Sequence, residues 1–73
     1  MSEFNPVFEA GRGAVRVKFT LLELCHYAGL TAYATLNRND QTGRDAYYKA
    51  YAKTLKNLAP NSPYLEGMAA YLE

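Results

Sequence analysis

The sequence has little of what defines the specialised classes of small protein. Its 73 residues include one Cys and no Trp, and no apolar run approaches the roughly 20 residues that span a bilayer. A single Cys excludes an internal disulfide, and with it the cysteine-rich secreted scaffolds. The first residues, "MSEFNP", have neither the basic start nor the apolar run of a signal peptide. These absences predict one small soluble domain in the cytoplasm, with no membrane contact.

Recognisable catalytic and metal-binding motifs are missing as well. Cys25 and His26 are the only soft metal ligands, whereas a zinc site needs about four. Adjacent helical positions point about 100° apart, so this pair cannot share the hydrogen bond that activates a Cys nucleophile. The glycines of "AGRGA" lack the Lys and Ser/Thr of a phosphate-binding loop. We therefore expect no enzymatic activity, no metal, no cofactor and no small-molecule substrate, and we assign Cys25 to the core.

Basic residues and tyrosines are what the chain has in quantity. All eight Lys and Arg lie between Arg12 and Lys56, and only three acids share that stretch, so it carries +5 within a chain of net charge +1. A basic middle suits a polyanion or an acidic protein surface. The seven tyrosines join large apolar rings to hydroxyl groups, which suits contact surfaces.

The N-terminal quarter predicts a β-strand or β-hairpin. Residues 13–19, "GAVRVKF", alternate between apolar and basic side chains. Residues 7–10 could pair back through a turn at residues 11–13, or residues 1–12 could form a mobile arm. A two-stranded ribbon is marginal alone, so we expect its apolar face to lie against helices. That face carries Val15, Val17 and Phe19, and the opposite face carries Arg16 and Lys18.

The rest of the chain predicts helices, within a single domain of residues 13–73. A first helix should begin at Thr20, which has capping-box spacing to Glu23, and should end at Gly29. Thr31 can cap a short second helix over about residues 32–39. The fold class is therefore mostly α: a small bundle of three to four short helices with a helix-turn-helix-like pair, preceded by a short β-strand or β-hairpin. The later helices are expected over residues 44–58 and from the Ser62 cap onward.

The helix expected over residues 44–58 has two distinct faces. Its apolar arc includes Tyr47, Tyr51 and Leu55. Its lysines lie within about 60° of each other on the opposite side, and we interpret them as a solvated face. They are Lys49, Lys53 and Lys56.

The segment "TLLELCHYAGLT", residues 20–31, resembles the first helix and turn of the helix-turn-helix regulators of the lactose-repressor and mercury-resistance families. The resemblance implies that the second helix of the pair reads DNA, with the Thr31 cap near a phosphate. On that helix it places Tyr33 at a base-reading position, with Asn37 and Arg38 following on the exposed side. Phosphates beside it would be held by the basic hairpin residues Arg12, Arg16 and Lys18.

Two functions follow from these observations. The first is a small non-enzymatic transcription regulator that contacts nucleic acid, and with few basic residues per chain it would need a homodimer to bind specifically. The alternative is a Tyr-rich protein–protein interaction module or inhibitor. By analogy of type, it would act like a phage-encoded modulator of host RNA polymerase. The expected partners are thus nucleic acid, a protein of the transcription machinery, or both.

Overall fold

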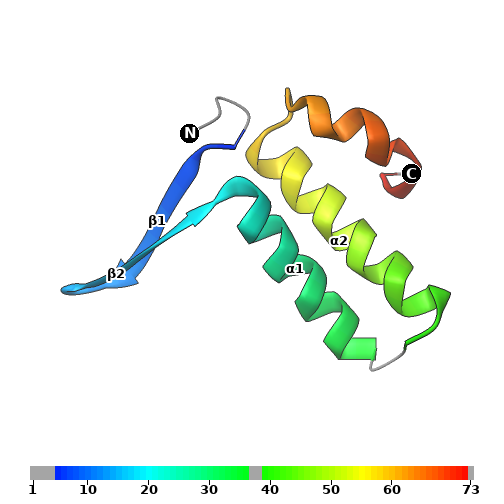
Figure 1. Ribbon diagram of the computed structural model, residues 1–73, viewed down its shortest axis with the longest axis horizontal. Coiled ribbons are helices and arrows are strands. Elements are labelled where there is room, and N and C mark those ends of the chain that lie inside the picture. The colour runs from blue at the N-terminus through cyan, green and yellow to red at the C-terminus, as the bar shows by residue number, and fades with distance from the viewer. Residues whose placement is uncertain (1–4, 37–38, 73) are drawn as a thin grey trace.

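The computed structural model describes residues 5–36 and 39–72, and within them the chain forms a β-hairpin followed by three helices (Figure 1). The predicted fold class, mostly helical with a hairpin in front, is confirmed. The third helix is a 3₁₀-helix that packs on α2. The elements are β1 (Val7–Arg12), β2 (Val15–Thr20), α1 (Leu21–Leu36), α2 (Gln41–Leu58) and η1 (Pro63–Tyr71).

The hairpin turn begins two residues later than predicted and keeps only Gly13 of the expected turn. The turn is Gly13–Ala14, and Gly13 adopts the positive φ of 59° that glycine tolerates. Gly11, which was expected in the turn, is instead paired within β1 opposite Arg16. A Cβ on Gly11 would lie only 2.8 Å from the Cα of Arg16. Gly11 is therefore needed for close packing of the two strands rather than for the turn.

The predicted helix caps that begin α1 and η1 are both present. The backbone N–H of Thr20 donates to Oε1 of Glu23 over 3.1 Å, and the N–H of Glu23 donates to Oγ1 of Thr20 over 3.2 Å. This reciprocal pair satisfies two N–H groups that a helix start leaves open. At η1, the Ser62 hydroxyl accepts from the N–H of Tyr64 over 3.3 Å, with Pro63 in the first turn.

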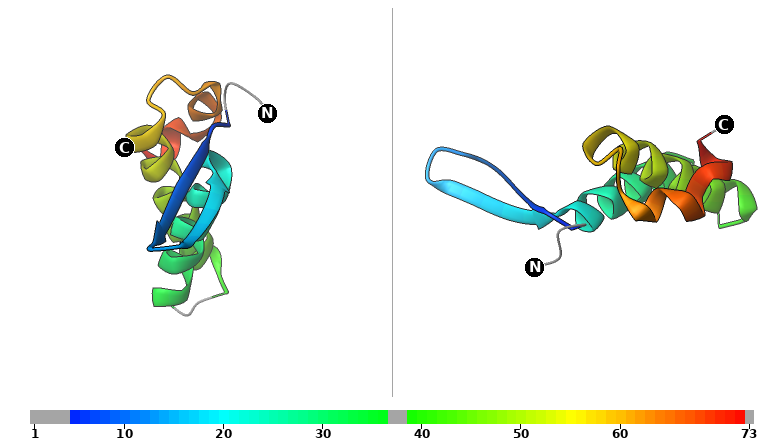
Figure 2. Two further views of the ribbon diagram at one scale, coloured as in Figure 1. Left: turned by 90° about the vertical axis from the view of Figure 1, so that its left-hand side faces the viewer. Right: turned by 90° about the horizontal axis from the view of Figure 1, so that it is seen from above.

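The hairpin is fastened to the helices at its base. The N–H of Leu21 donates to the carbonyl of Pro6 over 2.8 Å, and the N–H of Leu22 donates to Oδ1 of Asn5 over 3.1 Å. Residues just before β1 thus supply acceptors to the first turn of α1. The hairpin and the start of α1 therefore form one connected unit, although the tip of the hairpin projects away from the helices (Figures 1 and 2).

The helix break predicted at Gly29 is wrong, because α1 continues from Leu21 to Leu36. Gly29 is buried, and a Cβ there would lie 2.6 Å from Cε2 and 3.0 Å from Cγ of Tyr47. The glycine lets the Tyr47 ring of α2 approach α1 closely. Thr31 caps nothing, since its hydroxyl donates to the carbonyl of Tyr27 one turn earlier, over 2.9 Å.

Helix α2 begins three residues before the predicted start. Asp40 is its N-cap, and its carboxylate accepts from the N–H of Gly43 over 3.4 Å. An Asp at this position satisfies an open N–H and favours the positive end of the helix dipole. The polar run before residue 44 is therefore the cap and first turn of the helix rather than a loop.

The core is small and lies where the two long helices meet the base of the hairpin. Leu21, Cys25 and Leu55 have no exposed surface, which confirms the assignment of Cys25 to the core. Tyr64, in the first turn of η1, is 40% exposed. Side chains that pack against this core are only half-buried: Phe8, Tyr51, Ala59, Leu65 and Met68.

Candidate nucleic-acid interface

The predicted site residues fall into two groups that the structure keeps apart. The basic group lies on the hairpin, next to the N-terminal end of α1. Thr31 and Tyr33 lie near the other end of α1, and Tyr33 is about 18 Å along the axis from Leu21 at 1.5 Å per residue. Asn37 and Arg38 lie outside the described residues. The hairpin group consists of Arg12, Arg16 and Lys18.

Within the hairpin, the strand register divides the basic residues between two faces. Lys18 lies opposite Glu9, and Arg16 shares this face, with its Nε 3.8 Å from Oε1 of Glu9. Arg12 lies opposite Val15 and therefore on the other face. An acid beside two of the basic residues weakens the hairpin as a site for phosphate groups.

Tyr33 takes part in an aromatic surface between α1 and α2. Its hydroxyl donates to Oδ1 of Asn39. Its ring borders a hollow of about 220 Å³ whose lining has Leu30 on α1 and Arg44 on α2, completed by Tyr47 and Tyr48. Tyr33 is thus tied to the connection between the helices and to their packing.

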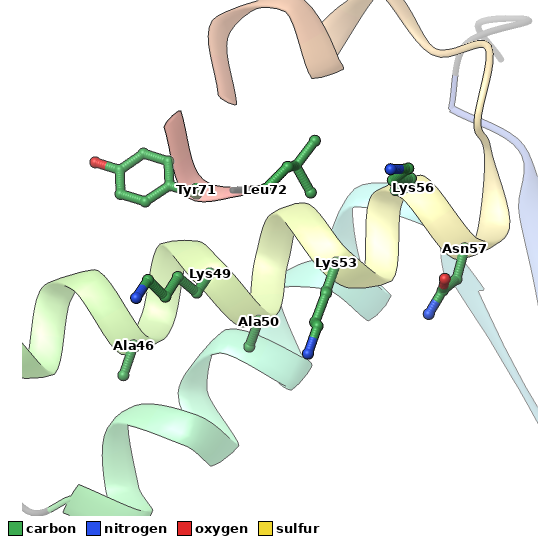
Figure 3. A pocket seen from close by; sticks show the side chains of 8 residues that line it. All are labelled: Ala46, Lys49, Ala50, Lys53, Lys56, Asn57, Tyr71 and Leu72. Carbon is green, nitrogen blue, oxygen red and sulfur yellow. The ribbon is translucent and has the colours of Figure 1, made fainter. Parts of the chain in front are cut away.

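A groove of about 680 Å³ runs along α2, on the side where the end of η1 lies (Figure 3). Its α2 residues recur at helical spacing and therefore form one stripe. The short side chains of Ala46 and Ala50 leave it open, and longer polar side chains border it. The lining residues are Ala46, Lys49, Ala50, Lys53, Lys56, Asn57, Tyr71 and Leu72.

The charge of this groove is entirely positive, and it is spread out. No carboxylate is among the lining residues, and the structure gives its lysines no ion pair with another described residue. Lys49 and Lys56 are about 10 Å apart along the helix axis, and Figure 3 shows the three lysine side chains pointing in different directions. The arrangement therefore suits an extended anion better than a single small one.

The solvent exposure predicted for these lysines is confirmed, but the second wall of the groove was missed. Tyr71 and Leu72 supply it from the end of η1. Tyr71 is held there by stacking on Tyr48 of α2, with ring centroids 5.3 Å apart and planes at 30°. The sequence predicted a helix from Ser62 onward, but it held no signal for the helix against which the end of that segment packs.

Three titratable side chains lie close together between α1 and α2: Cys25, His26 and Tyr47. Burial raises the pKa of the Cys25 thiol above its usual value of 9.0, so Cys25 is a poor nucleophile. Burial, followed by the neighbouring Tyr48 and Cys25, raises the pKa of Tyr47. The Tyr47 hydroxyl lies 2.6 Å from Nδ1 of His26. This contact links the two helices.

No group of three or more His, Cys, Asp or Glu side chains in residues 5–36 and 39–72 could hold a metal ion. Over the same residues, no helix has both the length and the apolar character needed to cross a membrane.

Comparison of the chain with protein-family models, with curated proteins and with solved structures finds no match.

Proposed function

We propose that this protein is a small non-enzymatic transcription regulator that binds a nucleic-acid strand through the lysine groove. The observation that carries the proposal is the row of Lys49, Lys53 and Lys56 along one groove that no acid lines. A positively charged groove that follows the phosphate backbone, with an aromatic ring beside it, is the common design for binding single strands.

The dimensions of the groove support a strand rather than a small anion. Lys49 and Lys56 are about 10 Å apart along the helix axis, so the three lysines can each contact a separate phosphate along a strand. Tyr71, half-buried at the groove wall, offers an aromatic ring next to the lysines.

The connection to transcription rests on the resemblance of residues 20–31 to helix-turn-helix regulators. The proposal differs from that family's mode of binding, since α1 has no turn at Gly29 and thus no separate recognition helix. Binding through the groove is accordingly expected to depend on the phosphates and to discriminate weakly between sequences.

The test is fluorescence anisotropy with a labelled single-stranded oligonucleotide, and it uses two variants that each remove three positive charges. The groove variant is Lys49→Gln, Lys53→Gln and Lys56→Gln. The hairpin variant is Arg12→Gln, Arg16→Gln and Lys18→Gln. Both sets of side chains are exposed, so both variants should fold.

For the unmodified protein, three phosphate contacts predict affinity falling about 20-fold between 50 and 200 mM salt, because log K falls by about 0.7 per contact per decade. The groove variant should lose most of this dependence, and the hairpin variant should keep it. Equal losses in both variants, or no binding at 50 mM salt, would contradict the proposal. A protein acting only through a protein partner would give the second result.

A further inference from the structure

The outer half of the hairpin is exposed on both faces, and its exposed side chains include apolar ones that no other described part of the fold covers. Phe8 packs against the core, and Phe19 meets the Tyr27 ring edge-on at a centroid distance of 5.6 Å. Further out, Val17 is 47% exposed and Val15 is 71% exposed. The expectation that the whole apolar face lies against the helices is therefore wrong for its outer half, because the strands extend past the helical body (Figure 2).

The outer edge of β2 combines unpaired backbone groups with side chains that alternate between an apolar and a basic face. Only β1 pairs with β2 among the described residues, so the far edge of β2 presents unpaired backbone N–H and C=O groups. Val15 and Val17 lie on one face, and Arg16 and Lys18 lie on the other. The edge of β1 lacks this regularity, because its polar face holds the acid Glu9 and the bare Gly11.

We propose that the edge of β2 accepts an extended segment of a partner protein as a third strand, with alternating apolar and acidic side chains. Backbone hydrogen bonds supply affinity in this mode of recognition, and alternate side chains supply specificity. The partner's apolar residues would cover Val15 and Val17, and its carboxylates would face Arg16 and Lys18. This inference does not depend on the lysine groove.

A second copy of the chain fits this edge poorly. If two β2 strands paired antiparallel with their faces matched, a register centred on Val17 would place Arg16 opposite Lys18 of the other copy, twice. A shift of one residue in the centre would bring Arg16 opposite Arg16 or Lys18 opposite Lys18. Like charges directly opposite one another destabilise a sheet, so β2 favours an acidic strand over itself.

Nucleic acid also fits less well than an acidic strand. Phosphates would contact only the face of Arg16 and Lys18. Val15 and Val17 would stay in water. An alternating strand is the occupant that uses both faces and the backbone edge together.

The test is a titration of the isotopically labelled full chain, followed by amide NMR shifts. The probe is the peptide Gly-Ser-Val-Glu-Val-Glu-Val-Ser-Gly, and the control peptide has Lys in place of both Glu. The acidic peptide should shift the amides of residues 15–20 and slow their hydrogen exchange. It should bind at least about fivefold more tightly than the basic one, from two opposite-charge pairs.

Two variants keep the test decisive. Arg16→Gln with Lys18→Gln should remove the preference between the peptides, and Val17→Lys should weaken the acidic peptide by disrupting the apolar face. Unchanged amides in α1 and α2 show that each variant is folded. Equal binding of both peptides, or shifts outside residues 15–20, would overturn the inference.

A parallel titration with the single-stranded oligonucleotide separates this inference from the proposed function. Oligonucleotide shifts at β2 without peptide shifts there would overturn the strand-addition site. An oligonucleotide that shifts nothing would contradict the lysine groove, whereas acidic-peptide shifts at β2 in the same sample would still support strand addition.

Discussion

The helical body and the hairpin use apolar side chains in opposite ways. In the body, Leu21 and Leu55 are completely buried, whereas Val15 of the hairpin keeps 71% of its surface in water. The two regions are joined through the first turn of α1 and the residues just before β1. Stability should therefore be concentrated in the body. For the exposed hairpin residues we propose a role in contacts outside the chain.

The largest expected effect comes from a substitution in the core of the body. Leu55→Ala should lower the free energy of unfolding by about 2–5 kcal/mol, because it removes buried methyl groups and leaves a cavity. In a chain this short that is most of the stability. The hairpin control is Val15→Thr, which should cost less than about 0.5 kcal/mol at an exposed position. Urea unfolding followed by circular dichroism measures the stability of both variants. Similar losses of stability in the two would contradict its concentration in the helical body.

The next effect tests why Gly29 lies in the middle of α1. Gly29→Ala should cost about 1–3 kcal/mol, since the added Cβ would press into the Tyr47 ring and strain its contact with His26. The matched control is Gly67→Ala, where a Cβ would meet nothing within 4 Å. Thermal unfolding of the two variants measures the difference. A stabilising Gly29→Ala would contradict the close approach of the helices.

A smaller effect tests the junction between the two regions. Thr20→Ala should cost about 1 kcal/mol, because it removes the cap at the start of α1. Thr31→Ala should cost almost nothing, since its hydroxyl only bonds back to the carbonyl of Tyr27. If residue 31 capped a separate recognition helix, the two variants would lose similar amounts in chemical denaturation.

The smallest effect is confined to alkaline pH and to the body. Burial raises the pKa of Cys25 above 9.0 and that of Tyr51 above 10.0, so both groups ionise first in the unfolded chain. Keeping these groups protonated adds to the free energy of unfolding, and this stabilisation is complete below pH 9. It is lost as the pH rises through the pKa values of the folded chain, by at most about 1.4 kcal/mol per pH unit for each group. Urea midpoints between pH 7 and 10.5 should stay level and then fall. Cys25→Ala should fall less steeply, and an identical fall would exclude the thiol as a cause.

Local signals predicted the parts of the fold that depend on neighbouring residues. The Thr20–Glu23 and Ser62 caps and the alternation in β2 could be predicted, because each involves side chains within a few positions. Gly29 could not, since it serves a contact with Tyr47, eighteen positions later, and a glycine looks alike in a turn and in a close helix contact. The groove depends in the same way on the end of η1 lying beside α2.

For the candidate site, too, the sequence predicted local features but not the contacts between distant segments. The sequence identified the lysines of α2 and their exposure. It also grouped the basic hairpin residues with residues in the far half of α1 as one site. In the structure these two groups lie toward opposite ends of α1. A continuous α1 removes the turn that had justified the grouping. What remains is a separation of two surfaces, for which we propose nucleic acid at the lysine groove and a protein strand at the hairpin edge.

The most direct test of this separation is an amide NMR titration of the full chain with a single-stranded oligonucleotide at 50 mM salt. We expect shifts at Lys49, Lys53, Lys56 and Tyr71, with residues 12–18 unchanged. Shifts concentrated in residues 12–18, with α2 and η1 unmoved, would contradict it.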